Sequence, residues 1–491
     1  MPRGCGRAQP GQGNGEARDH DEPEKTANHL DVYTRGMDRR LLAVVFFSAF
    51  VVSALVCKSH VGGWNDGSRI ATVDALTASH TFVIDGSPFE RGLGDKIRFH
   101  GHTYSDKQPL LPLLGAAVMF AVAPLGITLR HTPGTAIYLL TLFTVGIWFG
   151  VGCCYAFLFQ RLLGFDAKVA GAVAALTGLG TLALPYASVM ANHVPCGAAA
   201  LAGCYHLVRA RRGGRFDAAL GGLFFSIAFA FDAASALFAI TVVVLLWGGS
   251  LRSALVCCAA AIPVIALQAA FNVAISGSVI PTAYNAAVWT GSGPAPLGIG
   301  ASQMLHAHAP GLYARFLVNE LVGDKGLFSF TPLMVLAGYG LVAMWRASAE
   351  MRRIALALLT TAAVFVFAIV FLQDDTATAN FGERRYVDVF FIMCVALGPA
   401  LAAVRGTLGA LFARLLIVSS IAIAALGTVN PFAGNEGEWG VLRGVAEFGA
   451  LAHRAQVQAT LDVLLLVGLI VAVVRLTPLG VAAAPSAVAR R

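Results

Sequence analysis

Long apolar runs separated by short polar turns dominate the chain from residue 38 onward. A helix of about 20 apolar residues is long enough to cross a hydrocarbon core of ~30 Å. The pattern predicts an all-α polytopic membrane protein with about 12 transmembrane helices and one short helix that dips into the membrane without crossing it. The runs lie approximately at 41–57, 109–129, 135–160, 168–188, 194–208, 216–231, 233–248, 251–275, 327–345, 354–372, 386–404, 408–428 and 460–475.

Polar intervals are few, and the longest after the N-terminal tail is the stretch from Trp64 to Leu111. Residues 1–37 are rich in Gly, Arg, Asp, Glu and Pro, which is typical of a disordered segment. We therefore expect a disordered cytosolic tail over 1–37 and a transmembrane domain over 38–491. The external loops of that domain are expected at 58–108, 276–326, 373–385 and 429–459.

Charge is scarce and unevenly placed. Only 13% of the residues are charged, against roughly 25% in soluble proteins. The formal net charge of +8 would suit nucleic acid, but the arginine clusters stand in short loops or ends beside apolar runs, which is the positive-inside pattern. This pattern argues against nucleic acid as a partner and places both termini in the cytosol. The clusters are Arg39-Arg40, Arg209–Arg215, Arg346–Arg353 and Arg490-Arg491.

Topology counted from the two ends of the chain agrees only if segment 109–129 enters the membrane and returns on the same side. Pro109, Pro112 and Pro124 fit a short helix of this kind, packed against protein. A full crossing by 109–129 is the alternative, and it would require a different count elsewhere. With the dip, the candidate acidic residues all lie on the external face.

Polar residues that stand where a loop meets an apolar run are candidates for chemistry, because a charge at that depth is costly without a partner or water. Asp106-Lys107 is such a junction. Lys107 either pairs with Asp106 or binds a phosphate as a point charge. Asp66 follows Trp64, a residue type that anchors at the membrane interface, so it too is expected near headgroup depth.

Further polar groups interrupt or border apolar sequence. Asn192-His193 lies within LPYASVMANHVPCGAAA, where His193 is either a hydrogen-bonded core residue or a ligand for a metal or substrate. Asp232 stands between two apolar runs and can cap a helix at a tight turn without further function. Arg384 and Arg385 in FGERRY can clamp a lipid phosphate or simply anchor to headgroups.

The remaining polar positions carry weaker signals. Most other charges of the predicted external loops are expected to be solvated surface; among them are Asp85, Asp95, Asp374, Asp375 and Glu383. The nine cysteines include no CxxC pair and are expected to be small buried hydrophobes. Neither a disulfide framework nor a structural zinc site is indicated.

At these positions the chain resembles the GT-C superfamily of membrane glycosyltransferases. The resemblance is to the bacterial branch related to dolichyl-phosphate-mannose–protein mannosyltransferases and to lipid A aminoarabinose transferases. That branch carries an acidic residue shortly before an arginine and an alanine, and later an acidic–Lys–Pro–Pro–Leu element that opens a short apolar helix. Here NDGSRIA, with Asp66, Arg69 and Ala71, and DKQPL at 106–110 stand in these places. GLFSFTPLM at 326–334 and FGERRY at 381–386 also resemble stretches common in bacterial members.

The chain departs from that pattern at three points. The usual Asp-Glu pair is Asp66-Gly67, and the usual Pro-Pro is Gln108-Pro109. A second acidic residue, expected in the next external loop, is replaced by Asn192-His193.

The resemblance implies an inverting transfer of a sugar from a polyprenyl-phosphate-linked donor. A divalent metal held by Asp66, Asp106 and His193 is the one cofactor that it would allow. External loops 276–326 and 429–459 would shape the acceptor pocket. The implied roles are Asp66 as the base; Arg69, Lys107 and Arg384 or Arg385 as the phosphate-binding cations; and Asp106, Asn192 and His193 in support.

Two other classes fit the same spans: a transporter or lipid flippase, and a GT-C-like protein that has lost catalysis. Against transport, no inverted repeat is visible, and the polar groups gather on one face rather than at the midplane. We expect an integral protein of the bacterial cytoplasmic (inner) membrane with its active site facing outward. Its partners are then the donor lipid, membrane lipid and an acceptor that the sequence does not identify.

Overall fold

The computed structural model describes residues 22–285, 287–288, 310–372, 380–432, 467–468 and 471–480. The chain divides into two units, Met1–Val44 and Val45–Arg491. Helix α1 (Glu22–Val56) supplies the described part of the first unit and continues into the second. Several predicted segments lie outside the described residues: the tail before residue 22, residues 289–309 of the loop 276–326, residues 373–379 with Asp374 and Asp375, and residues 433–459 of the loop 429–459.

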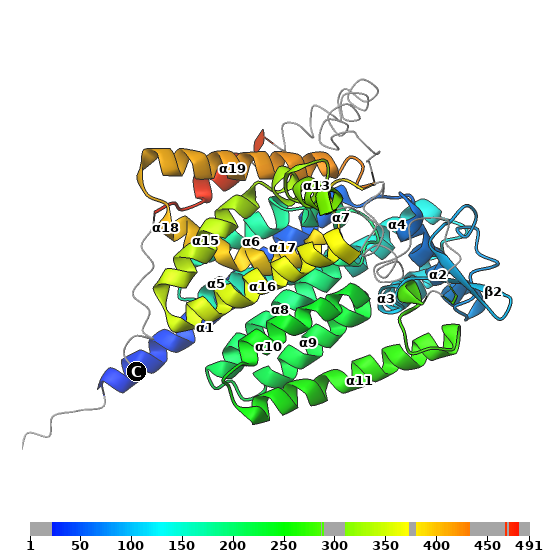
Figure 1. Ribbon diagram of the computed structural model, residues 1–491, viewed down its shortest axis with the longest axis horizontal. Helices are drawn as coiled ribbons and strands as arrows, with labels where there is room; N and C mark the ends of the chain where they lie inside the picture. The colour runs from blue at the N-terminus through cyan, green and yellow to red at the C-terminus, as the bar shows by residue number, and fades with distance from the viewer. Residues whose placement is uncertain are drawn as a thin grey trace, which may run out of the picture. The chain divides into compact units, whose positions relative to one another are not determined.

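The described part of the second unit is helical apart from one β-hairpin (Figure 1). After α1 its elements are α2 (Trp64–Ser79), β1 (Lys96–Phe99), β2 (His102–Ser105), α3 (Leu110–Val122), η1 (Ala123–Leu125), α4 (Pro133–Thr141), η2 (Leu142–Gly146), α5 (Ile147–Leu162), α6 (Ala167–Leu179), α7 (Ala183–Tyr186), α8 (His193–Arg211), α9 (Asp217–Phe231), η3 (Ala233–Phe238), α10 (Ala239–Leu246), α11 (Leu251–Ser276), η4 (Thr282–Tyr284), α13 (Pro310–Val322), α14 (Leu327–Phe330), α15 (Leu333–Ala347), α16 (Ala349–Leu372), α17 (Tyr386–Met393), η5 (Cys394–Ala396), α18 (Leu397–Ala403) and α19 (Gly406–Gly427).

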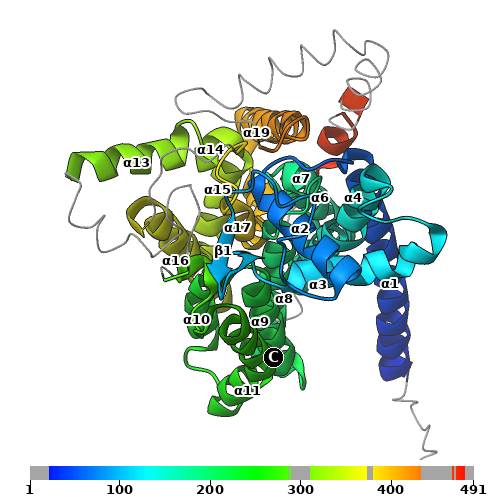
Figure 2. The same ribbon diagram turned by 90° about the vertical axis from the view of Figure 1, so that its right-hand side faces the viewer.

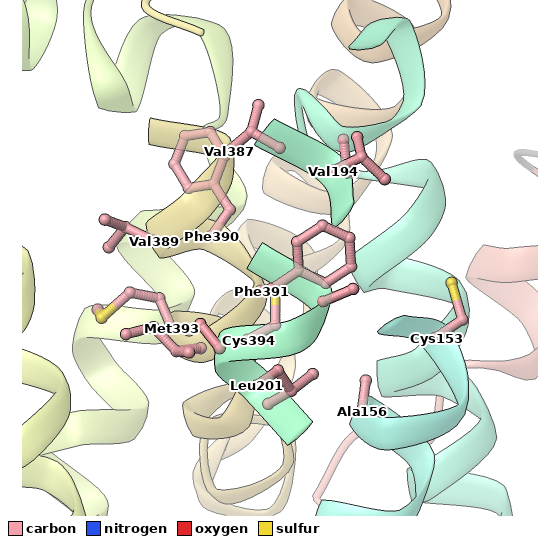
Figure 3. Close-up of a cluster of buried hydrophobic side chains, with 14 of the residues drawn as sticks. Cys153, Ala156, Val194, Leu201, Val387, Val389, Phe390, Phe391, Met393 and Cys394 are labelled. Carbon is pink, nitrogen blue, oxygen red and sulfur yellow. The ribbon is translucent and has the colours of Figure 1, made fainter. Parts of the chain in front are cut away.

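Helix α8 lies at the centre of the packing, in contact with α5, α9 and α17. Every residue from His193 to Val208 is buried. Glycines allow the close approach: a Cβ on Gly197 would lie 2.6 Å from the Phe391 ring of α17. Figure 3 shows Phe391 and Phe390 of α17 among Val194, Leu201 and their neighbours. Small residues at helix contacts of this kind are typical of packing inside membranes.

Six of the described helices are long and apolar enough to cross a membrane, or seven if a bent pair counts as one span. The bent pair, Tyr313–Phe330 and Leu333–Ala347, turns by 90°. Four shorter apolar helices follow predicted runs, among them Asp217–Phe231 and Ala233–Leu246. These two meet at Asp232, where the sequence predicts a tight turn. The total of about 12 spans stays a prediction.

The predicted dipping segment 109–129 forms α3, which has 13 residues and begins directly after Pro109. A single turn of 3-10 helix, η1, follows it and ends at Leu125. At 1.5 Å per residue this unit is about 24 Å long, which is shorter than the ~30 Å hydrocarbon core. Its length therefore fits a helix that dips, although the topology itself stays a prediction.

The polar stretch from Trp64 to Leu111 folds into α2 and the β1–β2 hairpin and then enters α3. Figures 1 and 2 show α2, α3 and the hairpin beside one another, and α2 contacts both α3 and β2. In the antiparallel hairpin Lys96 pairs with Ser105 and Phe99 with His102. This register brings Asp95, directly before β1, to the same end of the hairpin as Asp106, directly after β2.

Candidate active site

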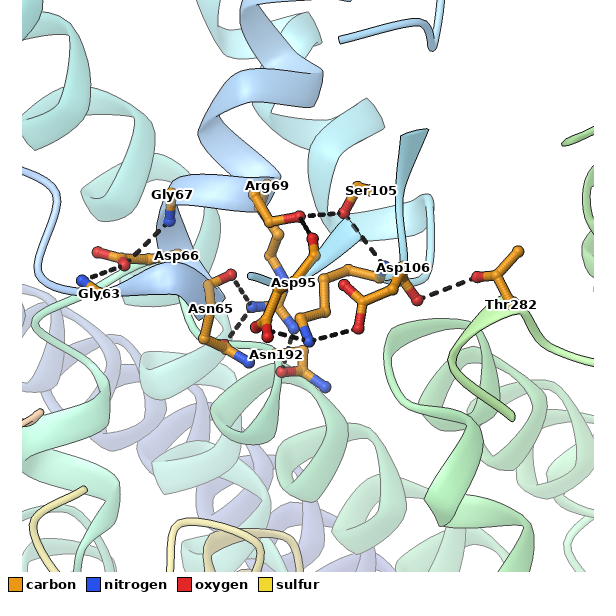
Figure 4. Close-up of polar contacts among 12 residues, drawn as sticks. Gly63, Asn65, Asp66, Gly67, Arg69, Asp95, Ser105, Asp106, Asn192 and Thr282 are labelled. Carbon is orange, nitrogen blue, oxygen red and sulfur yellow. Dashed lines mark hydrogen bonds and ion pairs between the residues drawn. The ribbon is translucent and has the colours of Figure 1, made fainter. Parts of the chain in front are cut away.

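Asp66 lies in the first turn of α2, and its carboxylate is held by backbone groups. It accepts hydrogen bonds from the N–H groups of Gly62 (2.8 Å), Gly63 (2.8 Å) and Gly67 (3.0 Å). Burial raises the pKa of Asp66, and these three hydrogen bonds only partly offset the effect. In Figure 4 the Asp66 carboxylate points toward Gly63 and Gly67, away from the side chains that gather around Asp95.

Arg69, one turn further along α2, is a buried cation held by neutral oxygens. Its guanidinium donates to the Asn65 carbonyl (2.7 Å), the Asn65 side chain and Asn192 Oδ1 (2.5 Å). In the described part of the chain it forms no ion pair with a carboxylate. Burial lowers the pKa of Arg69 to about 10. A buried charge is costly unless it is paired, so this guanidinium is suited to an anion that arrives from outside.

Lys107 bridges two carboxylates at the end of the hairpin. Its Nζ lies 2.8 Å from Asp95 Oδ2 and 2.9 Å from Asp106 Oδ2. Burial raises the pKa of Asp106, and Lys107 only partly offsets this. Burial also opposes the ionisation of Asp95, but the charge and hydrogen bond of Lys107, together with the charges of Arg384 and Arg69, outweigh it and lower the pKa of Asp95. Ser68 ties this end of the hairpin to α2 through the Asp95 carbonyl and the Ser105 hydroxyl, both at 2.6 Å. The sequence predicted that Lys107 either pairs with Asp106 or binds a phosphate. It did not predict that Asp95 also pairs with Lys107.

Two side chains beside Lys107 have polar atoms with no hydrogen-bond partner among the described residues. The atoms without a partner are Oδ1 of Asp106 and both amide atoms of Gln108, and the residue Asp106 is 1% exposed. The Asp106 backbone is fixed by Thr282, whose hydroxyl donates to its carbonyl (3.0 Å). Buried polar atoms normally have partners, so these atoms mark a place for a ligand or water.

Asn192 and His193 connect this cluster to the membrane helices. Asn192 accepts from Arg69 and donates to Asp232 Oδ2 (2.6 Å). Asp232 also caps η3 by accepting from the Ala234 N–H (2.9 Å), so the predicted capping role is present. His193 Nδ1 lies 3.3 Å from both carboxylate oxygens of Asp388 and 3.5 Å from Asp232 Oδ2.

The metal set expected from the sequence differs from the group that the structure brings together. Among the described residues, the group that could hold a metal ion is His193, Asp232 and Asp388. Asp66 is not in it because its oxygens hold the start of α2, and Asp106 is not in it because its carboxylate pairs with Lys107. Only His193 belongs to both sets.

The two arginines before α17 have different surroundings. Arg385 forms a bidentate pair with Glu383 (2.6 and 2.7 Å). Burial opposes the ionisation of Glu383, but Arg385 outweighs it and lowers the pKa of Glu383 to about 2. Arg384 donates to Asn380 Oδ1 (3.3 Å) and has no carboxylate partner in the described ranges.

The four cations predicted to hold a phosphate come together around the start of α8. The charges of Arg69, Lys107, Arg384 and Arg385 all act on His193. Asp388 was missed from the sequence, although a lone carboxylate within the apolar run YVDVFFIM was a signal that could have found it.

No family model matches the chain, and no curated protein matches it. Among solved structures it is similar to ArnT from Cupriavidus metallidurans bound to undecaprenyl phosphate, with 13% identity, a TM-score of 0.49, and coverage of 88% of this chain and 76% of that one. It is also similar to the oligosaccharyltransferase AglB from Archaeoglobus fulgidus in complex with an inhibitory peptide and a dolichol-phosphate, with 13% identity, a TM-score of 0.48, and coverage of 81% of this chain and 56% of that one. At this identity the likeness concerns the fold alone.

Proposed function

We propose that the chain is an inverting glycosyltransferase that uses a polyprenyl-phosphate-linked sugar at the outer face of the bacterial inner membrane. The observation that carries the proposal is the pair Arg69 and Arg384, two cations without a carboxylate partner in the described residues. They lie close enough for the charge of Arg384 to act on Arg69. Two such guanidinium groups supply the planar donors that a phosphate accepts bidentately.

Of the four predicted phosphate-binding cations, the contacts favour these two for direct binding. Lys107 already lies between Asp95 and Asp106, so its charge is largely compensated. Arg385 is paired with Glu383. We assign Lys107 and Arg385 to positioning: each fixes the backbone that presents a neighbouring polar group.

The reaction needs a base for the acceptor hydroxyl and donors for the leaving phosphate. The base takes the hydroxyl proton, the oxygen attacks the anomeric carbon, and the bond from that carbon to the phosphate oxygen breaks with inversion. Arg69 and Arg384 stabilise the charge that develops on the polyprenyl phosphate as it leaves. The acceptor is a hydroxyl compound whose class these residues do not define.

Two carboxylates compete for the part of the base. Motif resemblance favours Asp66, whose oxygens are occupied by three backbone N–H groups. Geometry offers Asp106, whose Oδ1 has no partner among the described residues and whose pKa is raised by burial. A raised pKa makes a carboxylate a stronger base near neutral pH, provided that it is ionised.

Lipid binding tests the phosphate site directly. Undecaprenyl phosphate is titrated into the purified, detergent-solubilised full chain, and binding is followed by native mass spectrometry. The double variant Arg69→Met/Arg384→Met is expected to bind roughly tenfold or more weakly than wild type, because charge-assisted hydrogen bonds are lost. Arg209→Met, at the other end of α8, is the matched control and should bind as wild type. Equal binding by all three proteins would remove the proposal.

A transfer assay separates the two bases. Membranes containing Asp66→Asn or Asp106→Asn at equal expression are assayed for consumption of the polyprenyl-phosphate sugar pool of the host. Loss of transfer in Asp66→Asn alone supports Asp66, and loss in Asp106→Asn alone supports Asp106. Full activity in both variants would overturn the carboxylate mechanism.

A further inference from the structure

Three side chains with ligand atoms meet where α8 begins, and each comes from a different element. His193 is the first residue of α8, Asp232 lies at the break between α9 and η3, and Asp388 is in the first turn of α17. Their ligand atoms all lie within 4.8 Å of one another.

The spacing of these atoms fits an ion better than it fits hydrogen bonds. His193 Nδ1 is 3.3 Å from Asp388 and 3.5 Å from Asp232, whereas charge-assisted N–H···O bonds are about 2.7–2.9 Å long. Around tetrahedral Zn²⁺, with bonds of about 2.0–2.1 Å to nitrogen and oxygen, neighbouring ligand atoms are about 3.3 Å apart. The two distances from His193 are close to the edges of such a tetrahedron.

The two carboxylates need a cation or a proton between them. The Asp388 side chain is 0% exposed and that of Asp232 16% exposed. In the described part of the chain neither forms an ion pair with lysine or arginine. Two carboxylates this close repel each other, and burial removes the water that would screen them.

An unpartnered oxygen lies beside the group. Ser235 follows Asp232 in η3, and its backbone N–H donates to the Asp232 carbonyl (3.0 Å). The Ser235 hydroxyl is 3% exposed and makes no hydrogen bond among the described residues. Buried polar atoms normally have partners, so this hydroxyl marks a place for a ligand or water next to the three side chains.

We propose that His193, Asp232 and Asp388 bind one zinc-type divalent cation, with a fourth position open to water or a substrate. An imidazole nitrogen with two carboxylate oxygens is a set that Zn²⁺ accepts, whereas Mg²⁺ and Ca²⁺ prefer oxygen ligands alone. The site keeps His193 of the set expected from the sequence and replaces Asp66 and Asp106. Zinc binding follows from these contacts and does not depend on the proposed sugar transfer.

Metal content tests the site. The purified full chain in detergent is incubated with ZnCl₂ and desalted, and zinc is measured by mass spectrometry of the elements. Wild type is expected to retain about one zinc per chain. His193→Ala and Asp388→Asn are expected to retain less than roughly a tenth of that amount, because one ligand of the shell is lost. Asp217→Asn, which alters the buried histidine–aspartate pair at the other end of α8, is the control and should retain zinc as wild type.

Absence of stoichiometric zinc in wild type, or full retention in both ligand variants, would overturn the site. If the variants do not fold, the site is tested on wild type by adding Co²⁺ and recording its absorption spectrum. Intense d–d bands at one equivalent of Co²⁺ support tetrahedral binding, and weak octahedral bands contradict it. If the chain retains zinc but does not transfer sugar, the proposed function is wrong and the zinc site stands. If the chain transfers sugar but retains no zinc, the zinc site is wrong and the proposed function stands.

Discussion

Helix α8 carries a buried histidine near each end, and the two have different partners. His206 uses both ring nitrogens in short contacts, 2.6 Å to Asp217 and 3.0 Å to the Tyr155 hydroxyl. His193 has carboxylates at 3.3 and 3.5 Å. The first arrangement is closed and holds three helices together. The second leaves room for a ligand.

The arginines near the two ends of α8 differ in the same way as the two histidines. Near the C-terminal end of α8, Arg209 lies 3.4 Å from Asp217. Around the N-terminal end, Arg69 and Arg384 have no carboxylate partner in the described ranges. Arg209 thus has a carboxylate beside it, whereas Arg69 and Arg384 have only neutral oxygens as hydrogen-bond partners in the described residues. Buried charge without a partner is expected at functional sites rather than at structural ones.

Removal of Arg69 should give the largest difference between the ends. In Arg69→Met we expect transfer to fall by about 10²–10³-fold, because a donor to the developing phosphate charge is lost. The melting temperature should fall moderately, because the Asn65 and Asn192 oxygens that accept from Arg69 lose a buried donor. Transfer and melting are measured on the same preparations, with Arg209→Met as the control. A matching loss of activity in Arg209→Met would erase the contrast.

Removal of Arg385 should mainly lower the stability of the fold. Arg385→Met leaves Glu383, which is 1% exposed, without its bidentate partner. Breaking a buried pair from one side costs about 3–5 kcal/mol, so a large drop in the unfolding free energy is expected. The double variant Arg385→Met/Glu383→Gln should recover part of this loss in denaturant unfolding. No recovery would show that the pair is not the cause.

Asp217→Asn tests whether the His206 end is purely structural. The change removes the charge from the 2.6 Å contact and should cost about 1–3 kcal/mol of unfolding free energy. Transfer at saturating donor should match wild type, because the pair lies at the far end of α8. A fall in transfer with unchanged stability would contradict the assignment.

The smallest effect is expected at the hairpin that carries Asp95 and Asp106 to the site. Asp85 pins β2 by accepting from the Thr103 N–H (2.9 Å) and contacting His102 (3.1 Å). Burial raises the pKa of Asp85, but the hydrogen bonds from Thr103 and His102 together outweigh it and lower the pKa below its usual range. Its stabilisation is thus present above pH ~4 and lost as the pH falls through the lowered pKa. Because the group is half-exposed, Asp85→Asn should remove less than about 1 kcal/mol, and only above that pH, in melting measured against pH.

The sequence shows where polar residues meet apolar runs, but it does not show which distant residues they contact in the fold. Asp106-Lys107 was visible because charge meets an apolar run within a few residues. Asp95 was not, since only the register of the hairpin sets it beside Asp106. Asp388 lies within an apolar run, and the packing of α17 on α8 brings it to His193. The base role of Asp66 stays a prediction, and its backbone contacts depend on the conformation of Gly62-Gly63.

Run lengths predicted where helices lie better than how many cross the membrane. The break at Asp232 was expected from one charge between two apolar runs, and α9 ends there. The 90° turn between α14 and α15 was not expected, because the apolar run 327–345 is predicted as one span, although Thr331-Pro332 interrupts it at the bend. A bend costs no hydrophobicity, so it leaves little trace in a hydropathy pattern.

The apolar contact of α8 with α17 has an electrical consequence. Between Val194 and Tyr205, α8 carries only apolar or small side chains, packed against Phe390 and Phe391 (Figure 3). An ion moving between His193 and His206 along this contact would lose its hydration in a medium of low dielectric, which is prohibitive. This apolar contact therefore gives no path for an ion between the two histidines, so the polar groups around His193 and those around His206 form separate sites.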